Sequence, residues 1–419
     1  MIRVAFKTVG CRLNQAETAR ITGQFTQAGY VVVQDLNADI LVINSCTITD
    51  NARKTSARFS RTAKSHNPRC IVVITGCAAQ IHGKDLMRES GADIVAGQED
   101  KFRILQLLSA HGIHTPSAAT CKTQTPDRPL FSTTRANIKV QDGCNFRCAY
   151  CIVPDARGNP VSRPQAEIVD EINRVAQDGF KEIILTGANL ACYGKNTSNT
   201  LIQLLQEVED IDGIKRVRLS SIEISTTERQ LIDYMATSKK LCRYLHFPLQ
   251  SGDDRILAAM GRRYTCNQYR STVEYALEHI PHLGLGTDLL TGLPGEDDKA
   301  FHNTCDLIDS LPFHNLHVFS YSKRPNTPAA TMPNQVPDAV KKQRNRTLTE
   351  IGRRKMQPAA ESYVGQHVSV LIEKSDGKTS TGWTSQYMPI RIMRSLEINT
   401  IHRVTVSSFN QDKRELHAK

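Results

Sequence analysis

Residues 143–158 read GCNFRCAYCIVPDARG. The loop begins at the glycine that ends NIKVQDG, residues 137–143, a run that predicts a β-strand ending in a turn. Within this loop Cys144, Cys148 and Cys151 have the spacing C-x3-C-x2-C. Three thiolates on one short loop can bind three irons of a cubane cluster and leave the fourth iron open to a small molecule. A zinc knuckle is the alternative, but structural zinc takes four protein ligands and this loop supplies three.

The composition indicates a globular chain of two or three domains with excess positive charge. The chain has 419 residues, more than one ordinary domain, and 53 Lys and Arg against 42 Asp and Glu give a formal charge of +11. This balance suits a polyanionic partner, although many basic proteins bind no nucleic acid. No apolar run approaches the roughly 20 residues that cross a bilayer, and the first residues lack the long apolar stretch of a signal peptide. We therefore expect a cytoplasmic protein without a membrane segment.

The cysteine content favours metal or cluster ligation over disulfides. Twelve cysteines occur in the chain, and the cytosol keeps thiols reduced. Several of them are therefore expected to be ligands. Six match no motif and are expected to be ordinary packed or surface thiols: Cys70, Cys121, Cys192, Cys242, Cys266 and Cys305.

The first part of the chain predicts an open parallel α/β sheet. Three apolar runs read as buried strands separated by helical stretches: residues 3–9, 39–45 and 70–76. Each run ends near a cysteine, namely Cys11, Cys46 and Cys77. Because ligands of such sheets collect at the carboxyl ends of the strands, the three thiols would converge and could hold a second cluster. Buried free cysteines are also common in cores, so these residues alone leave both interpretations open.

The central part predicts a partial parallel barrel. Six strand candidates alternate with helical segments such as residues 166–179: residues 137–143, 181–187, 216–222, 243–249, 283–292 and 315–321. Six βα units fit an incomplete (β/α)6 barrel better than an eight-unit one, with the active site at the carboxyl ends of the strands.

The last part predicts a basic helix followed by a small antiparallel β-barrel. Residues 114–129 read as a linker, and residues 340–363 as a helical connector. Three β runs follow: residues 367–376, 382–393 and 400–409. The predicted fold class is therefore α/β with three domains, bounded at residues 1–130, 131–340 and 341–419.

The three-cysteine loop resembles the signature of the radical S-adenosylmethionine superfamily, in which C-x3-C-x2-C follows the first barrel strand and an aromatic residue, here Tyr150, precedes the last cysteine. The resemblance implies a 4Fe–4S cluster on Cys144, Cys148 and Cys151 whose open iron is chelated by S-adenosylmethionine. It further implies reductive cleavage to a 5′-deoxyadenosyl radical and an external electron donor such as a flavodoxin or ferredoxin.

The N-terminal cysteines stand in KTVGCRLNQAET, INSCTITDNARK and ITGCAAQ, which resemble the N-terminal domain of the methylthiotransferases. The resemblance extends over almost the whole chain, including a C-terminal barrel called TRAM. It implies that Cys11, Cys46 and Cys77 bind an auxiliary 4Fe–4S cluster. It also implies that one S-adenosylmethionine methylates a sulfur on that cluster and a second supplies the radical, so that C–H becomes C–S–CH3.

Members of this family modify an adenosine beside the anticodon of tRNA or an aspartate of a ribosomal protein. RLSSIEI, residues 218–224, and RPNTPAATMPNQVP, residues 324–337, look most like the group that converts threonylcarbamoyladenosine to its 2-methylthio derivative. The sequence departs mildly from that group at residues 187–194 and 289–296. Another tRNA adenosine, a ribosomal aspartate and a noncatalytic iron–sulfur RNA-binding protein remain alternatives.

Polar residues at the predicted strand ends are candidates for contact with the cofactor or the base. These are Asn189, Ser220, Glu223, His246 and Gln250, together with Asp288. For each of them, a structural hydrogen bond would explain the residue equally well.

Two arginines follow the cysteine loop. Arg157 and Arg163 could pair with the cofactor carboxylate or with a phosphate, since guanidinium groups suit both anions. A structural role for at least one of them is equally compatible with the sequence.

The C-terminal part carries a candidate RNA-binding surface. The connector contains seven basic residues: Lys341, Lys342, Arg344, Arg346, Arg353, Arg354 and Lys355. The terminal module adds Trp383, Tyr387, Arg391 and Arg394. Neutralised phosphates and stacked bases are typical of single-stranded RNA recognition, whereas a charged helix face alone is usually just solvated.

Overall fold

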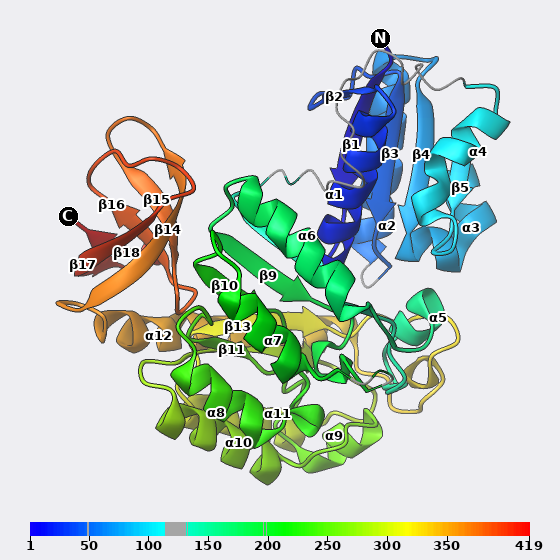
Figure 1. Ribbon diagram of the computed structural model, residues 1–419. Coiled ribbons are helices and arrows are strands. Elements are labelled where there is room, and N and C mark those ends of the chain that lie inside the picture. Colours follow the sequence, from blue (N-terminus) through cyan, green and yellow to red (C-terminus); the bar gives the residue numbers. More distant parts are fainter. Residues whose placement is uncertain (48–49, 114–130, 132, 196, 198) are drawn as a thin grey trace. The chain divides into compact units, whose positions relative to one another are not determined.

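The computed structural model describes residues 1–419 apart from 48–49, 114–130, 132, 196 and 198 (Figure 1). The predicted linker at residues 114–129 and Cys121 therefore lie outside the described residues. The chain forms two compact units. The first unit comprises Met1–Ser132, Asp142–Asn145 and Ile152–Pro160, and the second comprises Thr133–Gln141, Phe146–Cys151 and Val161–Lys419.

The first unit contains a five-stranded parallel sheet in the order β2-β1-β3-β4-β5. Its strands are β1 Arg3–Thr8, β2 Val31–Val33, β3 Ile40–Ser45, β4 Ile71–Gly76 and β5 Ile94–Ala96. Its helices are α1 Arg12–Gln27, α2 Asp50–His66, α3 Cys77–Ser90, η1 Lys101–Arg103, α4 Ile104–Ala110 and α5 Val153–Arg157. The three predicted strands are confirmed as the central ones, while the three-residue edge strands β2 and β5 were missed.

The central strands are apolar on both faces because helices cover both. Leu41 and Ile43 of β3 pack in a cluster with Ala63 of α2 and Ala78 of α3. Val42, which points to the opposite face as expected for a two-residue period, packs in a second cluster with residues of α1 and α4. The unit is thus a three-layer α/β/α arrangement, the architecture that continuous apolar strands predict.

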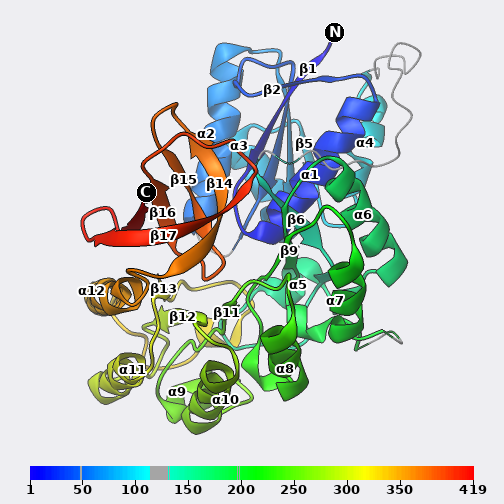
Figure 2. The same cartoon turned by 60° about the vertical axis from the view of Figure 1, so that its left-hand side comes forward.

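The second unit begins with a partial barrel of six strands, whose strands β6, β9, β11, β12 and β13 are labelled in Figure 2. Two parallel sheets, β10-β9-β6 and β11-β12-β13, are linked by a parallel bridge between Val217 and Leu241. The strands are β6 Arg135–Lys139, β9 Glu182–Thr186, β10 Arg216–Leu219, β11 Tyr244–His246, β12 Gly284–Thr291 and β13 Asn315–Ser320, with short β7 Gln141–Asp142 and β8 Val161–Ser162. The six barrel strands each lie within or overlap a predicted run, so the expected (β/α)6 architecture is confirmed.

Helices alternate with these strands. They are α6 Gln165–Gln177, α7 Leu201–Asp210, α8 Arg229–Thr237, α9 Asp254–Ala259, α10 Cys266–His279 and α11 Asp298–Ser310, with the short η3 Leu190–Cys192, η4 Ile224–Thr226 and η5 Pro328–Ala330. Thr200 and Thr265 begin α7 and α10 through reciprocal capping boxes with Gln203 and Gln268. Among the described residues, no helix is long and apolar enough to span a membrane.

The chain ends in helix α12, Asp338–Glu361, and a closed five-stranded barrel in the order β14-β15-β16-β18-β17. The strands are β14 His367–Ser375, β15 Ser380–Thr384, β16 Pro389–Ile392, β17 Ile401–Asn410 and β18 Glu415–Ala418. The barrel is not wholly antiparallel, because β16 and β18 pair in parallel. An odd number of strands cannot close with alternating directions throughout, so one parallel pair is required.

The run at residues 382–393 was predicted as one β segment and is instead the inner part of a hairpin. Tyr387 adopts a φ of 64°, in the left-handed region, and the turn before it ends β15. β16 then starts at Pro389. Strand β18 was missed because its four residues, ELHA, carry too little apolar pattern.

A buried ionic group connects the partial barrel to this hairpin. Arg218 Nε donates a hydrogen bond to the carboxylate of Glu182 on β9 at 3.0 Å. Arg216 Nε also lies 3.0 Å from the Glu182 carboxylate. Arg218 is fully buried and donates further hydrogen bonds to the carbonyls of Thr384 and Ser385, each at 3.1 Å. Burial favours the neutral form of Glu182, but Arg218, Arg216 and a third arginine outweigh it and lower its pKa.

We predict that Arg218→Leu lowers the stability of the second unit by about 3–5 kcal/mol, because Glu182 would lose its fully buried partner. Thermal unfolding of the full chain at neutral pH measures the effect. Since the folded-state pKa of Glu182 lies below its ordinary value of 4.5, the stabilisation is present above that pH and is lost on acidification below it. The control is Arg353→Leu, which removes an exposed pair with Glu350 and should cost less than about 1 kcal/mol. Equal effects of both substitutions would contradict the prediction.

Candidate active site

The first cysteine set lies at one edge of the first sheet. Strands β1, β3 and β4 are adjacent and parallel, so their carboxyl ends meet at the same edge. Cys11 precedes α1, Cys46 follows β3 directly, and Cys77 is the first residue of α3. Cys46 and Cys77 are buried, whereas Cys11 is exposed, and none of the three forms a disulfide. The sheet therefore brings together the thiols that the sequence singled out.

The surroundings of these thiols are polar and cationic. Asn14 Oδ1 accepts a hydrogen bond from Cys11 Sγ at 3.2 Å, and Gln98 Nε2 lies 3.5 Å from Cys77 Sγ. The pKa of the Cys77 thiol is raised, because burial outweighs the lowering effect of Arg157 and Lys101. Metals bind the thiolate, and nearby cations reduce the cost of burying that charge. Three thiols at one edge with such donors fit an iron–sulfur cluster.

Arg157 is held by carboxylates of the first unit. Its Nη1 lies 2.9 Å from Glu17 and 3.0 Å from Asp142, and its Nη2 lies 3.2 Å from Asn14 Oδ1. Lys101 Nζ lies 2.6 Å from the other oxygen of Glu17. The side chains of Arg157, Glu17 and Lys101 are at most 3% exposed. These contacts give Arg157 the structural role that the sequence left open.

Arg163 also has partners within the protein. Its Nη1 donates to the carbonyl of Lys139 and to Glu171, both at 2.7 Å. It therefore joins the loop before α6 to the end of β6. Both arginines that were considered for the cofactor carboxylate thus have partners within the protein, and a contact with the cofactor stays a prediction.

The loop of the second cysteine set is held by backbone hydrogen bonds. The Cys144 N–H donates to the carbonyl of Gly158 at 3.0 Å, and the Cys151 N–H donates to that of Cys148 at 2.9 Å. Gly143 has a φ of 70°, and a Cβ there would lie 2.0 Å from the carbonyl oxygen of Asn159. Only glycine therefore fits at the turn that begins the loop.

A buried arginine that the sequence did not identify contacts this loop. Arg262 Nη1 lies 3.6 Å from Cys148 Sγ, and its Nη2 pairs with Glu223. Its Nε donates to Tyr264 OH at 3.1 Å. In the sequence, Arg262 is marked only as one of two adjacent arginines in GRR, residues 261–263, and the sequence does not distinguish it from Arg263. Glu223 thus contacts the cysteine loop indirectly, through Arg262.

Asn189 and Ser220 follow the neighbouring strands β9 and β10 at their carboxyl ends. The Asn189 N–H is bound to Gln141 Oε1 at 2.9 Å, but its side-chain Oδ1 is buried with no hydrogen-bond partner in the described structure. The same holds for Ser220 Oγ. A buried polar atom without a partner costs about 1–3 kcal/mol, so these atoms fit a site that a polar ligand completes.

His246 and Asp288 are in contact, and a residue that the sequence did not single out joins them. His246 Nε2 lies 3.0 Å from Asp288 Oδ1, and His317 Nδ1 lies 3.1 Å from the same oxygen. Burial opposes the charge of Asp288, but the two histidine hydrogen bonds lower its pKa. Gln250 has a φ of 68°, and its backbone pairs with that of Asp288. His317 was missed because it stands in the middle of a strand, where only the register with β12 reveals it.

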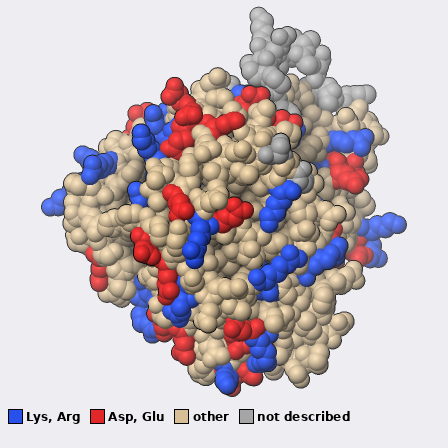
Figure 3. All heavy atoms as spheres, turned by 60° about the horizontal axis from the view of Figure 1, so that its bottom comes forward, with Lys and Arg blue, Asp and Glu red and all other residues tan. Residues whose placement is uncertain are grey.

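Most of the basic connector is neutralised by neighbouring acids. In α12, Arg344 pairs with Glu296 and Asp298, and Arg354 pairs with Asp309. Figure 3 shows one face of the molecule, on which acidic and basic side chains are interspersed. In the terminal module, Trp383 and Tyr387 stack on each other at 4.6 Å, Trp383 donates to Glu373, and Arg391 pairs with Glu415. The net charge alone therefore does not define an RNA surface.

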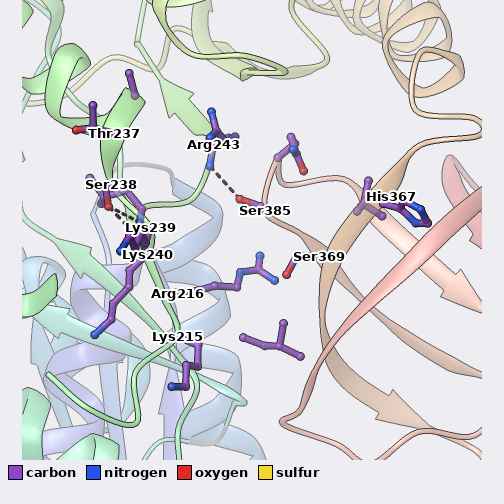
Figure 4. Close-up of a pocket in the computed structure, with 15 residues that line it drawn as sticks. Lys215, Arg216, Thr237, Ser238, Lys239, Lys240, Arg243, His367, Ser369 and Ser385 are labelled. Carbon is purple, nitrogen blue, oxygen red and sulfur yellow. Dashed lines mark hydrogen bonds between the residues drawn. The ribbon is translucent and has the colours of Figure 1, made fainter. Parts of the chain in front are cut away.

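A groove in the second unit has a basic lining (Figure 4), which is contacted by Glu209 through Ser238 and by Glu182 through Arg216. It has a volume of about 550 Å³, and its described lining residues include no Asp or Glu. The basic ones are Lys215, Arg216, Lys239, Lys240, Arg243 and His367, accompanied by hydroxyls of Thr237, Ser238, Ser369 and Ser385. We call this the basic groove.

Arg216 is the buried cation of the basic groove. Its guanidinium extends toward Ser369 in Figure 4, and its Nη2 is buried with no hydrogen-bond partner in the described structure. The same side chain is paired with Glu182 and donates to the carbonyl of Trp383 at 3.2 Å. A planar guanidinium with an unused donor suits an anionic oxygen.

Comparisons with known proteins match both cysteine regions. The family model of the Radical SAM superfamily matches residues 138–308, and that of the Uncharacterized protein family UPF0004 matches residues 3–97. The fold is similar to that of the radical S-adenosylmethionine methyltransferase TsrM from Kitasatospora setae, with a TM-score of 0.58 and 16% identity, covering 78% of this chain and 77% of that one. This likeness shows the fold alone. The chain is thus a radical S-adenosylmethionine protein with an additional N-terminal module.

Relatives of similar length define the family. The threonylcarbamoyladenosine tRNA methylthiotransferase MtaB of Aquifex aeolicus is 34% identical over 97% of this chain and all of its own length. The MtaB protein of Bacillus subtilis is 34% identical over 93% of this chain and 90% of its own length. The MtaB protein of Thermotoga maritima is 31% identical over 98% of this chain and 96% of its own length. The chain belongs to the MtaB-type methylthiotransferase family of radical S-adenosylmethionine enzymes. Membership implies one 4Fe–4S cluster and S-adenosylmethionine as cofactors.

We predict that Asn189→Ala weakens S-adenosylmethionine binding about tenfold, because one buried hydrogen bond contributes about 1–1.5 kcal/mol. Calorimetric titration of the anaerobically reconstituted full chain measures the dissociation constant. Asn267→Ala, an exposed asparagine on α10, is the control and should bind normally. An unchanged constant in both Asn189→Ala and Ser220→Ala would rule out these two residues as cofactor contacts.

Proposed function

We propose that this enzyme converts N6-threonylcarbamoyladenosine beside the anticodon of tRNA to its 2-methylthio derivative. The observation that carries the proposal is the end-to-end similarity to three MtaB proteins, each at 31–34% identity over at least 93% of this chain. The chemistry replaces a C–H bond of the adenine ring by C–S–CH3, which requires both an oxidant strong enough to activate that carbon and a sulfur donor.

The two cysteine sets would supply these two requirements. Cys144, Cys148 and Cys151 would hold the cluster that, with S-adenosylmethionine and an electron from a donor such as a flavodoxin or ferredoxin, supplies the 5′-deoxyadenosyl radical. Cys11, Cys46 and Cys77 would hold an auxiliary 4Fe–4S cluster as the sulfur side. Two observations support this assignment: the three thiols follow adjacent strands at one sheet edge, and cations lie beside Cys77.

The other polar residues would bind and orient rather than react. Asn189 Oδ1 and Ser220 Oγ, which lack partners in the described structure, would complete their hydrogen bonds to the cofactor. Glu223 pairs with the guanidinium of Arg262, whose Nη1 lies 3.6 Å from Cys148 Sγ. The pair would therefore help to position the loop that carries the ligating thiol.

The basic groove would hold the phosphate backbone of the tRNA. Lys215 and Lys239 are exposed and have no side-chain partner among the described residues, and Arg216 supplies a buried donor. Phosphate neutralisation by such residues gives affinity without sequence readout. The groove therefore supports RNA as the substrate more directly than the basic connector, whose charges are mostly paired.

The proposed reaction is tested by mass spectrometry of tRNA nucleosides from cells that lack the protein. We expect the 2-methylthio form of threonylcarbamoyladenosine to disappear and the unmodified form to accumulate. Wild-type protein and Cys70→Ala should restore it, because Cys70 is a buried thiol of the core cluster between β4 and its helices. Cys46→Ala should not restore it, and its purified form should carry about four irons fewer than wild type.

Three results would count against the proposal, from the tRNA nucleosides, from mass spectrometry of ribosomal proteins of the same cells, and from the iron analysis. Normal levels of the 2-methylthio nucleoside in the deletion strain, with no second enzyme present, would exclude N6-threonylcarbamoyladenosine as the substrate. Loss of a methylthio group from a ribosomal protein instead would favour the aspartate alternative. Full iron content and activity in Cys46→Ala would remove the auxiliary cluster from the assignment.

For the basic groove, we predict that Lys215→Ala combined with Lys239→Ala weakens tRNA binding and makes it less salt-dependent. Two lost phosphate contacts should lower the slope of log K against log salt by about 1.4–1.8. Filter binding over a salt series measures this slope. The charge-matched control combines Lys84→Ala with Lys299→Ala, both exposed and away from the groove lining, and should keep the wild-type slope. Equal slopes for the two double variants would exclude the groove as an RNA contact.

A further inference from the structure

Three metal-ligating side chains meet on the adjacent strands β11, β12 and β13. His246 is the last residue of β11 and is paired with Gly286 of β12, while Asp288 is paired with His317 of β13. One ligand atom from each of the two histidines and the aspartate lies within 4.8 Å of the other two. The cluster is therefore fixed by strand register rather than by flexible loops.

We propose that His246, Asp288 and His317 bind one divalent transition-metal ion. Two imidazole nitrogens and one carboxylate oxygen are the ligand set of many mononuclear zinc and iron(II) sites. In the structure, His246 Nε2 and His317 Nδ1 lie 3.0 Å and 3.1 Å from Asp288 Oδ1. With bonds of about 2.1 Å, neighbouring ligands lie about 3.0 Å apart around an octahedral ion and about 3.4 Å apart around a tetrahedral one. The two distances to Asp288 Oδ1 are close to these values, and the two histidine nitrogens lie within 4.8 Å of each other.

Residues around the cluster support this ligation. Tyr244 OH lies 3.0 Å from His246 Nδ1, and Asn315 Nδ2 donates to the same hydroxyl at 2.9 Å. When Nε2 binds an ion, the hydrogen of the neutral ring moves to Nδ1, where Tyr244 can accept it. Metal-binding histidines usually have such a partner on their other nitrogen, because it fixes the tautomer and the ring orientation.

Glycine at position 286 makes room for these side chains. A Cβ on Gly286 would lie 2.0 Å from Tyr244 OH and 2.5 Å from His246 Nδ1. Any larger residue would therefore displace the ligand and its supporting hydroxyl. The second glycine of LGLGTD, Gly286, is therefore required by the packing of this cluster.

The cluster is open on one side. The side chains of His246, Asp288 and His317 are 6%, 20% and 49% exposed, so accessibility rises toward β13. His317 also lines a cavity of about 360 Å³ that includes Lys413 and Arg414. Three protein ligands leave coordination positions free, and those facing the cavity would take water or an anionic oxygen such as a carboxylate or phosphate.

The proposed ion is independent of the iron–sulfur chemistry. Its ligands are nitrogen and oxygen, whereas the clusters require thiolates, and none of the six assigned cysteines belongs to the group. The proposal also stands whether or not the substrate is tRNA.

The test uses the full chain with its iron–sulfur clusters reconstituted, because empty cysteine sites would themselves bind zinc. The protein is incubated anaerobically with zinc chloride, freed of excess metal by gel filtration, and analysed for zinc and iron by mass spectrometry. We expect about one zinc per chain in the wild type and nearly none in Asp288→Asn or His317→Gln, with equal iron in all three. His302→Gln, which changes an exposed histidine bonded only to its own helix, should keep the zinc.

His317→Gln keeps the test decisive if the more buried Asp288→Asn fails to fold, because His317 is half exposed on an edge strand. A thermal shift supplies a second measurement: zinc should raise the unfolding temperature of the wild type and of His302→Gln, but not of the ligand variants. Absence of zinc from the wild type, or full retention in both ligand variants, would overturn the proposal.

Discussion

Parallel strand pairing is the constraint on which the chemistry of this protein depends. Strands that run in the same direction end at the same edge, so residues that follow different strands become neighbours although they are far apart in the sequence. In the first unit this brings Cys11, Cys46 and Cys77 to one edge of the sheet. In the second unit it aligns Asn189 with Ser220. These residues are far apart in the sequence, so the register of the strands, rather than local chain geometry, sets their positions.

Charge is arranged differently at the surface and in the interior. On α12 four of the seven basic side chains pair with nearby acids, namely Lys341, Arg344, Arg353 and Arg354, which reduces the unbalanced charge along the helix. Inside the second unit, Glu182 is surrounded by more arginines than it can neutralise, and Arg216 keeps an unused donor at the basic groove. Buried excess charge is costly without a counter-ion, so this region favours an anionic partner more than the exposed run does.

The central strands of both sheets were predicted correctly because their apolar runs are long and continuous. The cysteine ligands stay a prediction, based on the spacing of one set and on the strand ends that precede the other. Strands β2, β5 and β18 were missed because three or four residues show no period. The partners of Arg157 and the role of Arg262 were also out of reach. Arg157 meets Glu17 across 140 positions, and Arg262 meets Cys148 across 114, separations at which a single sequence carries no pairing signal.

The proposed RNA contact and the proposed cofactor site lie at opposite ends of strand β10. Arg216 begins β10 at the basic groove, and Ser220 follows the other end of the same strand at the proposed cofactor site. At about 3.3 Å per residue, the four residues of β10 separate these sites by only about 13 Å. A stem-loop is much larger than this, so one RNA can contact the groove through its backbone while one of its bases reaches the carboxyl ends of the strands. The phosphate contacts would then position the RNA, and the residues at the strand ends would select the base.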